Sequence, residues 1–306
     1  LILHHDDCLK HDTGPRHAES PARITAVING IGNIPGTEML PAPRATEGQL
    51  ELAHTPDYWK RLLELEPQRK DPQSRIALDA DTYLSAGSID ATLRGSGAAC
   101  FAVDQVFKGK ARNAFCATRP PGHHANAATA MGFCLLNQAA VAARHAQTAH
   151  GAGRIAILDF DVHHGNGTQD IFEDSPDVLY ISSHQIPLYP GTGYPEELGC
   201  GNILNLPLAP GSGSAEFRRT WSDHGFRAME NFAPDLVIVS AGFDAHIADP
   251  LAQLELGDED YGWITSEICA FADAKCGARV VSGLEGGYDL DALSSASAAH
   301  VTALAG

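Results

Sequence analysis

Residues 157–172 read ILDFDVHHGNGTQDIF, an apolar run that breaks into two aspartates, two histidines and a glycine-containing turn. The apolar part is typical of a buried β-strand. Carboxylates and imidazoles directly after such a strand are costly to bury without partners. The stretch therefore predicts a strand whose end carries polar groups that something else must hold.

Four apolar runs in the chain end in the same kind of polar, glycine-containing segment. NAFCAT (113–118) precedes RPPGHHA, RIAILDF (154–160) precedes DVHHGNG, LVIVSA (236–241) precedes GFDAH, and RVVSGL (279–284) precedes EGGYD. Ligands of open α/β sheets bind outside the carboxyl ends of the strands. The four segments are therefore expected to meet at one site, although they lie far apart in the sequence.

Helical segments alternate with these runs from one end of the chain to the other. Continuous apolar runs between helices are typical of a parallel sheet buried on both faces. Ser20 is an expected N-cap, and Pro21 suits the first position of the first helix. With no linker-like stretch, the pattern predicts an α/β fold and a single domain over 1–306. The other expected elements are a strand over 178–183 and helices over 88–107, 137–150, 214–232 and 258–275.

Composition limits the partners and the compartment. The formal net charge is −17, from 21 Lys and Arg against 38 Asp and Glu, which argues against a nucleic-acid or anionic-membrane partner. The seven cysteines include no CxxC pair, so a reducing interior fits better than a disulfide framework. No signal peptide and no apolar stretch of about 20 residues is evident. We therefore expect a cytoplasmic protein.

Three residues at two strand ends form a candidate metal site. In extended backbone Asp161 and His163 point the same way, and Asp244 could supply a third ligand. Three protein ligands with an open position are typical of a catalytic metal. Zinc suits this mixed set, and Fe(II) or Co(II) stays open. The alternative interpretation is a hydrogen-bonded strand terminus without metal.

The tandem His123–His124 is the candidate acid–base element, because a metal-activated water needs a nearby base and the leaving group needs a proton. Asp159 could hold one imidazole and Asn166 the other. Tyr288, after two glycines, could donate a hydrogen bond to a developing oxyanion. Taken alone, Tyr288 could equally be an ordinary buried tyrosine.

Six ordered motifs together resemble the zinc-dependent histone deacetylase superfamily, and within it the bacterial class II-like histone deacetylase and acetylpolyamine amidohydrolase branch. The likeness covers nearly the whole chain, and HAESPARI near the N-terminus is similar to the HPESPxRI of that branch. It implies the arginase/deacetylase fold, a three-layer α/β domain around a mostly parallel eight-stranded sheet. The motifs are RPPGHHA, GFCLLN, LDFDVHHGNGTQDIF, YPGTG, SAGFDAHIADP and LEGGYD.

The resemblance implies a role for each group. It makes Asp161, His163 and Asp244 the ligands of one zinc ion, and Tyr288 the tyrosine that polarises the substrate carbonyl. His123 and His124 are then the catalytic pair. Asp159 is the partner of His123, and Asn166, a class II-like residue, is the partner of His124.

The resemblance also implies a substrate tunnel and potassium sites. Phe133 and Tyr189 match the two aromatic walls, with Gly132 beside them, and Tyr189 replaces the more usual Phe. One or two structural potassium ions are implied. Matching residues are Asp159, Ser182 and the backbone of Asp161 and His163 for a site near the zinc, and Phe172, Ser175 and Val178 for a distant one.

The sequence thus predicts a zinc amidohydrolase that removes acetyl or other acyl groups from the ε-amine of lysine in a protein or peptide. Leu251 occupies the place where polyamine-selective relatives carry an acidic residue, which favours acyl-lysine. Acids elsewhere, including those of a partner subunit, keep acetylpolyamines and a homo-oligomer open. A non-catalytic acyl-lysine binder should lack a site residue, and none is missing. An arginase-like two-metal site would need Asp where Gly242 stands.

Overall fold

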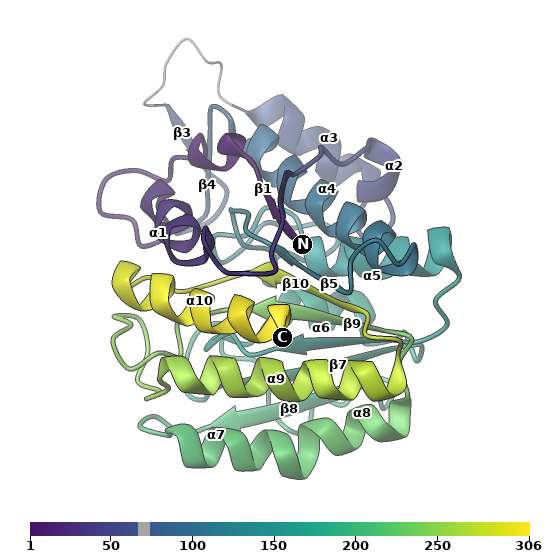
Figure 1. Ribbon diagram of the computed structural model, residues 1–306. Coiled ribbons are helices and arrows are strands. Elements are labelled where there is room, and N and C mark those ends of the chain that lie inside the picture. The colour runs from purple at the N-terminus through teal and green to yellow at the C-terminus, as the bar shows by residue number, and fades with distance from the viewer. Residues whose placement is uncertain (67–73) are drawn as a thin grey trace.

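A computed structural model gives the fold, and it describes residues 1–66 and 74–306. Eight strands in this part of the chain form one sheet in the order β2-β1-β5-β10-β9-β6-β7-β8, and every neighbouring pair is parallel (Figure 1). The expected eight-stranded α/β sheet is therefore confirmed. Its strands are β1 (Ile2–His4), β2 (Met39–Pro41), β5 (Asn113–Cys116), β6 (Ile155–Asp159), β7 (Val178–Gln185), β8 (Ile203–Leu208), β9 (Leu236–Ala241) and β10 (Val280–Leu284).

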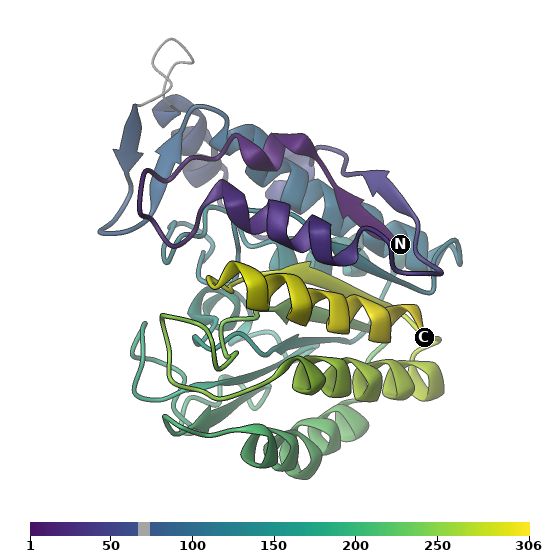
Figure 2. The same cartoon turned by 60° about the vertical axis from the view of Figure 1, so that its left-hand side comes forward.

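Helices cover both faces of the sheet, which gives three layers (Figures 1 and 2). A short antiparallel hairpin, β3 (Arg75–Ala77) with β4 (Tyr83–Ser85), lies outside the main sheet. The helices are α1 (Pro21–Ile31), α2 (Glu47–Leu50), α3 (Pro56–Leu65), α4 (Ser88–Phe107), α5 (Gln138–His150), α6 (Asn166–Phe172), α7 (Ser214–Thr220), α8 (Phe226–Phe232), α9 (Asp258–Lys275) and α10 (Leu290–Ala305), with a 3-10 helix at Asp6–Leu9.

Alternation along the strands explains the layers. On β6, Ala156 and Leu158 pack into a core with α1, α7, α9 and α10, while Ile155 and Ile157 pack into a second core with α4 and α5. Successive side chains of a strand point to opposite faces, so a strand that is apolar at every position buries both. The continuous apolar runs of the sequence therefore become central strands.

The expected start of the first helix is confirmed. Ser20 is the N-cap of α1 and has extended backbone, although its side chain makes no capping hydrogen bond, and Pro21 is at the first helical position. One other expected element is wrong. The segment 214–232 is not one α-helix, because a π-helix at Trp221–Gly225 separates α7 from α8. The aromatic ring of Trp221 is fully buried there and donates from its indole nitrogen to Ser183 at 3.0 Å.

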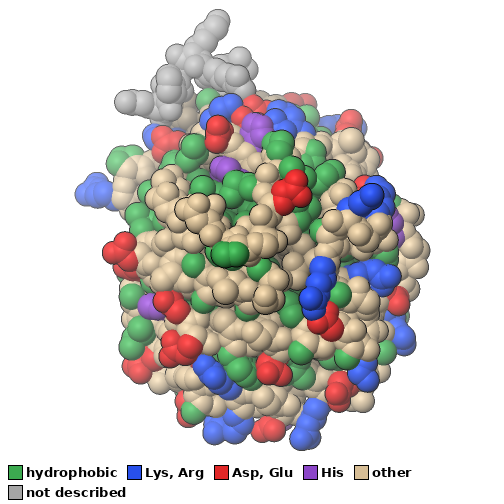
Figure 3. All heavy atoms as spheres, in the orientation of Figure 1, with side chains coloured by type: hydrophobic (Ala, Val, Ile, Leu, Met, Phe, Trp, Pro, Cys, Tyr) green, Lys and Arg blue, Asp and Glu red, His purple; other side chains and the backbone are tan. Residues whose placement is uncertain are grey.

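The surface carries mixed charge. On the face formed by α1, α7, α8, α9 and α10, acidic and basic side chains lie interspersed (Figure 3). Among the described helices, none combines the length and the apolar character that crossing a bilayer requires.

Candidate active site

Four neighbouring strands bring the functional residues together. β5, β10, β9 and β6 lie side by side, and the segments after their carboxyl ends surround a cavity of about 220 Å³. Parallel strands end at the same edge of a sheet, which explains why segments so distant in sequence meet. The cavity is lined by Asp81, His124, Gly132, Phe133, His163, Leu188, Tyr189, Leu251 and Tyr288.

Asp161, His163 and Asp244 form a buried cluster beneath this cavity. The Nδ1 atom of His163 lies 3.1 Å from Oδ1 of Asp161 and 3.1 Å from Oδ2 of Asp244, and the three ligand atoms lie within 4.8 Å of one another. Burial and the facing Asp161 carboxylate raise the pKa of Asp244 to about 7. Two buried carboxylates that repel each other and one imidazole are a donor set that favours a bound cation.

Two glycines that follow strand ends leave the space that the carboxylates of this cluster occupy. A Cβ atom at Gly286 would lie 2.1 Å from Oδ2 of Asp244 and 2.6 Å from Oδ2 of Asp161. A Cβ atom at Gly242 would lie 2.1 Å from Oδ2 of Asp161. The Gly286 amide donates to Oδ2 of Asp161 at 2.8 Å, so the backbone of Gly286 contacts the carboxylate directly. The residues therefore fit one zinc ion, and an Asp at position 242 would have no room.

The histidine pair is held by two different partners. Nδ1 of His123 lies 3.0 Å from Oδ2 of Asp159, and Nδ1 of His124 lies 2.8 Å from Oδ1 of Asn166. The two rings are 4.0 Å apart. Burial lowers the pKa of His123, but Asp159 and Asp161 outweigh it and hold that pKa well above its usual value. Burial and the neighbouring His123 hold the pKa of His124 well below its usual value, so His124 is neutral.

Glu285 and Tyr180 hydrogen-bond to the histidine pair or to its partner Asp159, and neither was predicted as a site residue from the sequence. Glu285 is buried, and its carboxylate accepts from the backbone amides of Gly122 at 2.6 Å and His123 at 3.1 Å. The Tyr180 hydroxyl donates to Oδ2 of Asp159 at 2.9 Å. Glu285 is the acidic residue of LEGGYD, and its position directly after a predicted strand is a signal that could have identified it. Tyr180 lies within an apolar run, where nothing distinguishes it from core.

Tyr288 turns its ring into the cavity wall. Its backbone amide donates to Oδ2 of Asp249 at 2.7 Å, its ring meets Phe133 edge-on at 5.9 Å, and the Arg23 guanidinium lies 4.9 Å from the ring centre. Burial raises the pKa of Tyr288 well above its usual value. The phenol therefore stays protonated and can donate a hydrogen bond at the base of the cavity.

The four expected tunnel residues all line the cavity. Gly132 has a φ of 54°, and a Cβ atom there would lie 2.4 Å from the His124 ring, so the close approach needs glycine. The Tyr189 ring meets His124 edge-on at 5.2 Å, and Leu251 completes the wall. Asp81 also lines the cavity, although it belongs to none of the motifs recognised in the sequence.

The two expected potassium sets differ in their surroundings. Asp159 is paired with Ser182 across β6 and β7, next to the metal cluster. The carbonyls of Phe172, Ser175 and Val178 do converge, but each accepts from the Asn202 side-chain amide, at 2.8, 3.0 and 2.8 Å. An amide nitrogen has only two hydrogens and cannot satisfy three carbonyl oxygens, so the second potassium set stays a prediction.

Comparison with known proteins places this site in a family. Residues 17–304 match the histone deacetylase domain. The chain belongs to the histone deacetylase family. It is 37% identical to a probable deacetylase of Archaeoglobus fulgidus, covering all of this chain and 86% of that protein. It is 35% identical to a histone deacetylase-like amidohydrolase of Pseudomonas aeruginosa, covering 92% of this chain and 79% of the relative.

A solved structure supports the same conclusion. The crystal structure of the HDA15 HD domain superposes with a TM-score of 0.90 at 34% identity, covering all of this chain and 90% of that one. The family resemblance and the three-layer fold expected from the sequence are thereby confirmed. This histone deacetylase family member is a hydrolytic deacetylase.

Proposed function

We propose that this deacetylase removes acetyl or other acyl groups from the ε-amine of lysine, with one zinc ion bound by Asp161, His163 and Asp244. The observation that carries the proposal is that His163 of this metal set, His124 of the histidine pair and Tyr288 all line one cavity. Its wall of Phe133, Tyr189 and Leu251 suits the aliphatic part of an acyl-lysine.

The residues around the cavity divide the chemistry. When bound, zinc supplies Lewis-acid polarisation of the carbonyl and lowers the pKa of a water molecule. Neutral His124 accepts a proton from the attacking water as the carbon–oxygen bond forms, and returns it to the departing amine nitrogen as the carbon–nitrogen bond breaks. The Tyr288 phenol donates a hydrogen bond to the carbonyl oxygen as negative charge develops there. His123, held by Asp159, provides a neighbouring positive charge.

Substituting Tyr288 tests this division of roles. In Tyr288→Phe we expect kcat on an acetyl-lysine peptide to fall by about 100- to 1,000-fold with unchanged zinc content, because one oxyanion donor is lost. Tyr189→Phe is the matched control, since it removes the phenol hydroxyl of another cavity-lining tyrosine and should retain activity. Turnover like the wild type in Tyr288→Phe would refute the role of Tyr288.

A second candidate is an acetylpolyamine deacetylase, and Asp81 is the observation that favours it. Its carboxylate lines the cavity, where it could pair with a distant ammonium. A panel of kcat/KM values for acyl-lysine peptides, acetylputrescine and acetylspermidine separates the candidates. We expect the peptides to be preferred, and equal or higher efficiency on the polyamines would overturn that preference. Loss of turnover with a chelator, restored by zinc, would exclude a non-catalytic binder.

The proposal extends to the organisation of the chain. We treat residues 1–306 as a single domain, which is supported by one sheet that contains both β1 and β10. A potassium ion at Asp159 and Ser182 is proposed by family resemblance alone. A cytoplasmic location is proposed from the seven cysteines, all of which have free thiols.

A further inference from the structure

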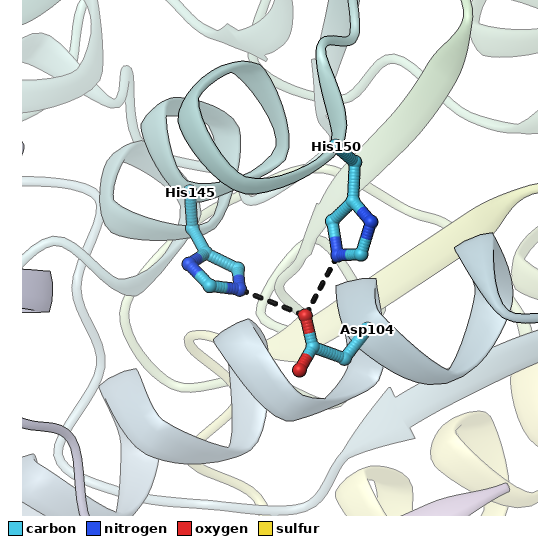
Figure 4. A group of neighbouring side chains, drawn as sticks. All are labelled: Asp104, His145 and His150. Atoms are coloured by element: carbon cyan, nitrogen blue, oxygen red, sulfur yellow. Dashed lines mark hydrogen bonds and ion pairs between the residues drawn. The ribbon is translucent and has the colours of Figure 1, made fainter.

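A second cluster of metal-ligating side chains lies between α4 and α5, away from the cavity. Oδ1 of Asp104 lies 3.0 Å from Nε2 of His145 and 2.7 Å from Nε2 of His150, and the two imidazoles converge on that oxygen (Figure 4). Asp104 is on α4, and both histidines are on the last turns of α5. None of the three belongs to the proposed active site.

The cluster lies near the amino ends of the parallel strands, whereas the proposed catalytic residues lie at their carboxyl ends. His150 ends α5 and precedes β6, which begins at Ile155, whereas Asp159 and the zinc ligands come at the far end of β6. The whole strand therefore separates the two sites. A ligand bound at this cluster cannot be a second occupant of the catalytic centre.

The donor set and its spacing fit a divalent transition metal. Two imidazoles and one carboxylate suit zinc, nickel or copper. The three ligand atoms lie within 4.8 Å of one another, and a tetrahedral site with bonds of about 2.0–2.2 Å places ligand atoms about 3.3–3.6 Å apart. Oδ1 of Asp104 must therefore move away from the two imidazole nitrogens by less than about 1 Å for an ion to enter, and those nitrogens, at most 4.8 Å apart, must adopt the same spacing.

Neighbouring side chains hold the ligands in place. The His150 ring stacks on Phe107 with centroids 4.7 Å apart and planes 11° apart, and the Arg279 guanidinium lies 4.8 Å from the Phe107 ring centre. The side chains of His145 and His150 are 12% and 16% exposed, so an ion can reach the cluster while water is partly excluded. Such preorganisation lowers the cost of assembling a metal site.

The charge of the cluster is compatible with a cation. Lys108 donates to Oδ2 of Asp104 at 3.1 Å, which leaves Oδ1 to the histidines. Burial raises the pKa of Asp104, but hydrogen bonds from His150, His145 and Lys108 outweigh it and lower that pKa to about 2. The Asp104 carboxylate is therefore ionised, and its Oδ1 atom faces both imidazoles.

We propose that Asp104, His145 and His150 bind a second divalent transition-metal ion, with zinc as the probe, and that the ion links α4 to α5. The bound ion replaces the two imidazole–carboxylate contacts with coordinate bonds, and solvent supplies the remaining position. Because ligands from two helices are joined, binding should stabilise the folded chain.

Metal stoichiometry tests the proposal. The wild type, His145→Gln/His150→Gln and Asp104→Asn are saturated with zinc at pH 7.5, desalted and analysed by mass spectrometry for zinc per chain. We expect both variants to bind one equivalent fewer than the wild type. His224→Gln, which changes an exposed histidine, is the matched control and should bind as much as the wild type.

Stability and activity give independent readouts. With the catalytic site already loaded, excess zinc should raise Tm of the wild type by about 2–5 °C and leave Tm of the double variant unchanged. The kcat/KM on an acetyl-lysine peptide should stay within about twofold in all variants. An equal zinc content in wild type and both variants would overturn the proposal. The test compares the zinc content of the wild type with that of the variants, so it remains valid even if the catalytic site does not bind zinc.

Discussion

Single glycines decide whether the proposed metal ligands can approach one another. Gly286 lies directly against the carboxylates of Asp244 and Asp161, while Gly283, three residues earlier, has no heavy atom within 4 Å of an added Cβ. Neither glycine has a positive φ, so the two positions differ in space and not in backbone strain. This pair separates the effect of crowding the ligands from the effect of adding a methyl group to the same segment.

We expect Gly286→Ala to lose the catalytic metal and at least about 100-fold in kcat/KM, because a Cβ at about 2 Å forces both carboxylates apart. Gly283→Ala should retain both. Zinc content and peptide deacetylation measured on the two purified variants check this. A fully active, zinc-loaded Gly286→Ala would contradict the close packing around the ligands.

At this scale, site geometry was most predictable from the sequence where two residues lie close together in the chain. Asp161 and His163 sit two residues apart in extended backbone, so their shared orientation followed from alternation. Glu285 and Asp81 were missed because their importance arises from contacts with distant residues. Glu285 holds the backbone of His123 across 162 positions, and no local spacing reveals such a contact.

At the scale of elements, strands with continuous apolar runs were predicted from the sequence, whereas short or interrupted strands were not. β1 and β2 have three residues each, which is too short for a hydrophobic period. β8 reads ILNLPL, and its Asn and Pro interrupt the apolar pattern of an edge strand. The order of the strands was not predictable either, because it depends on how helices pack across the whole sheet.

One buried histidine ties three elements together. His300 of α10 lies 2.6 Å from the Thr265 hydroxyl of α9 and 2.8 Å from the Ser282 hydroxyl of β10. Burial lowers the pKa of His300 to about 3, far below the usual value of about 6.5. The histidine is therefore neutral in the folded chain and takes up a proton on unfolding in mild acid.

This difference predicts a pH dependence of stability. Between about pH 6.5 and pH 3 the unfolded chain binds one proton more at this position, so His300 lowers the free energy of unfolding by about 1.4 kcal/mol for each unit that the pH falls. Its contribution is complete above pH 6.5. In His300→Gln the slope between pH 6 and pH 4.5 should be shallower by that amount.

Urea unfolding at several pH values measures the slope. The absolute stability of His300→Gln does not affect the comparison, because only the change with pH is used. The exposed-histidine variant His224→Gln should keep the wild-type slope. An identical slope in His300→Gln would show that His300 is protonated in the folded chain.

Across the whole molecule, a segment before and within α1 meets the loop after β10 beside the active site. Arg23 of α1 donates to the carbonyls of Gly287 and Glu285, beside Tyr288, and Glu19 accepts from the Arg119 guanidinium at 2.6 and 2.7 Å. All these charged groups are buried. The HAESPARI segment therefore packs against the loop that carries Tyr288, which gives a physical reason why a motif distant in sequence from the other site residues belongs to the family pattern.

The whole molecule also carries a net charge of −17. Acidic and basic side chains are interspersed on the face of Figure 3, so the excess acts as a diffuse field and not as one acidic patch on that face. Such a field attracts cationic substrates and repels anionic ones over distances comparable with the Debye length. Asp81 on the cavity wall adds to this attraction at short range.

We expect kcat/KM for an acetyl-lysine peptide with three flanking lysines to fall by about threefold to tenfold between 10 and 100 mM salt, as the Debye length shrinks from about 30 Å to about 10 Å. A peptide of the same length with neutral flanks is the control and should change little. Initial rates at constant potassium, with sodium chloride varied, give both values. The same salt dependence for the two peptides would mean that the net charge of the protein plays no part in substrate capture, and that local contacts in the cavity alone determine which acyl-lysines are used.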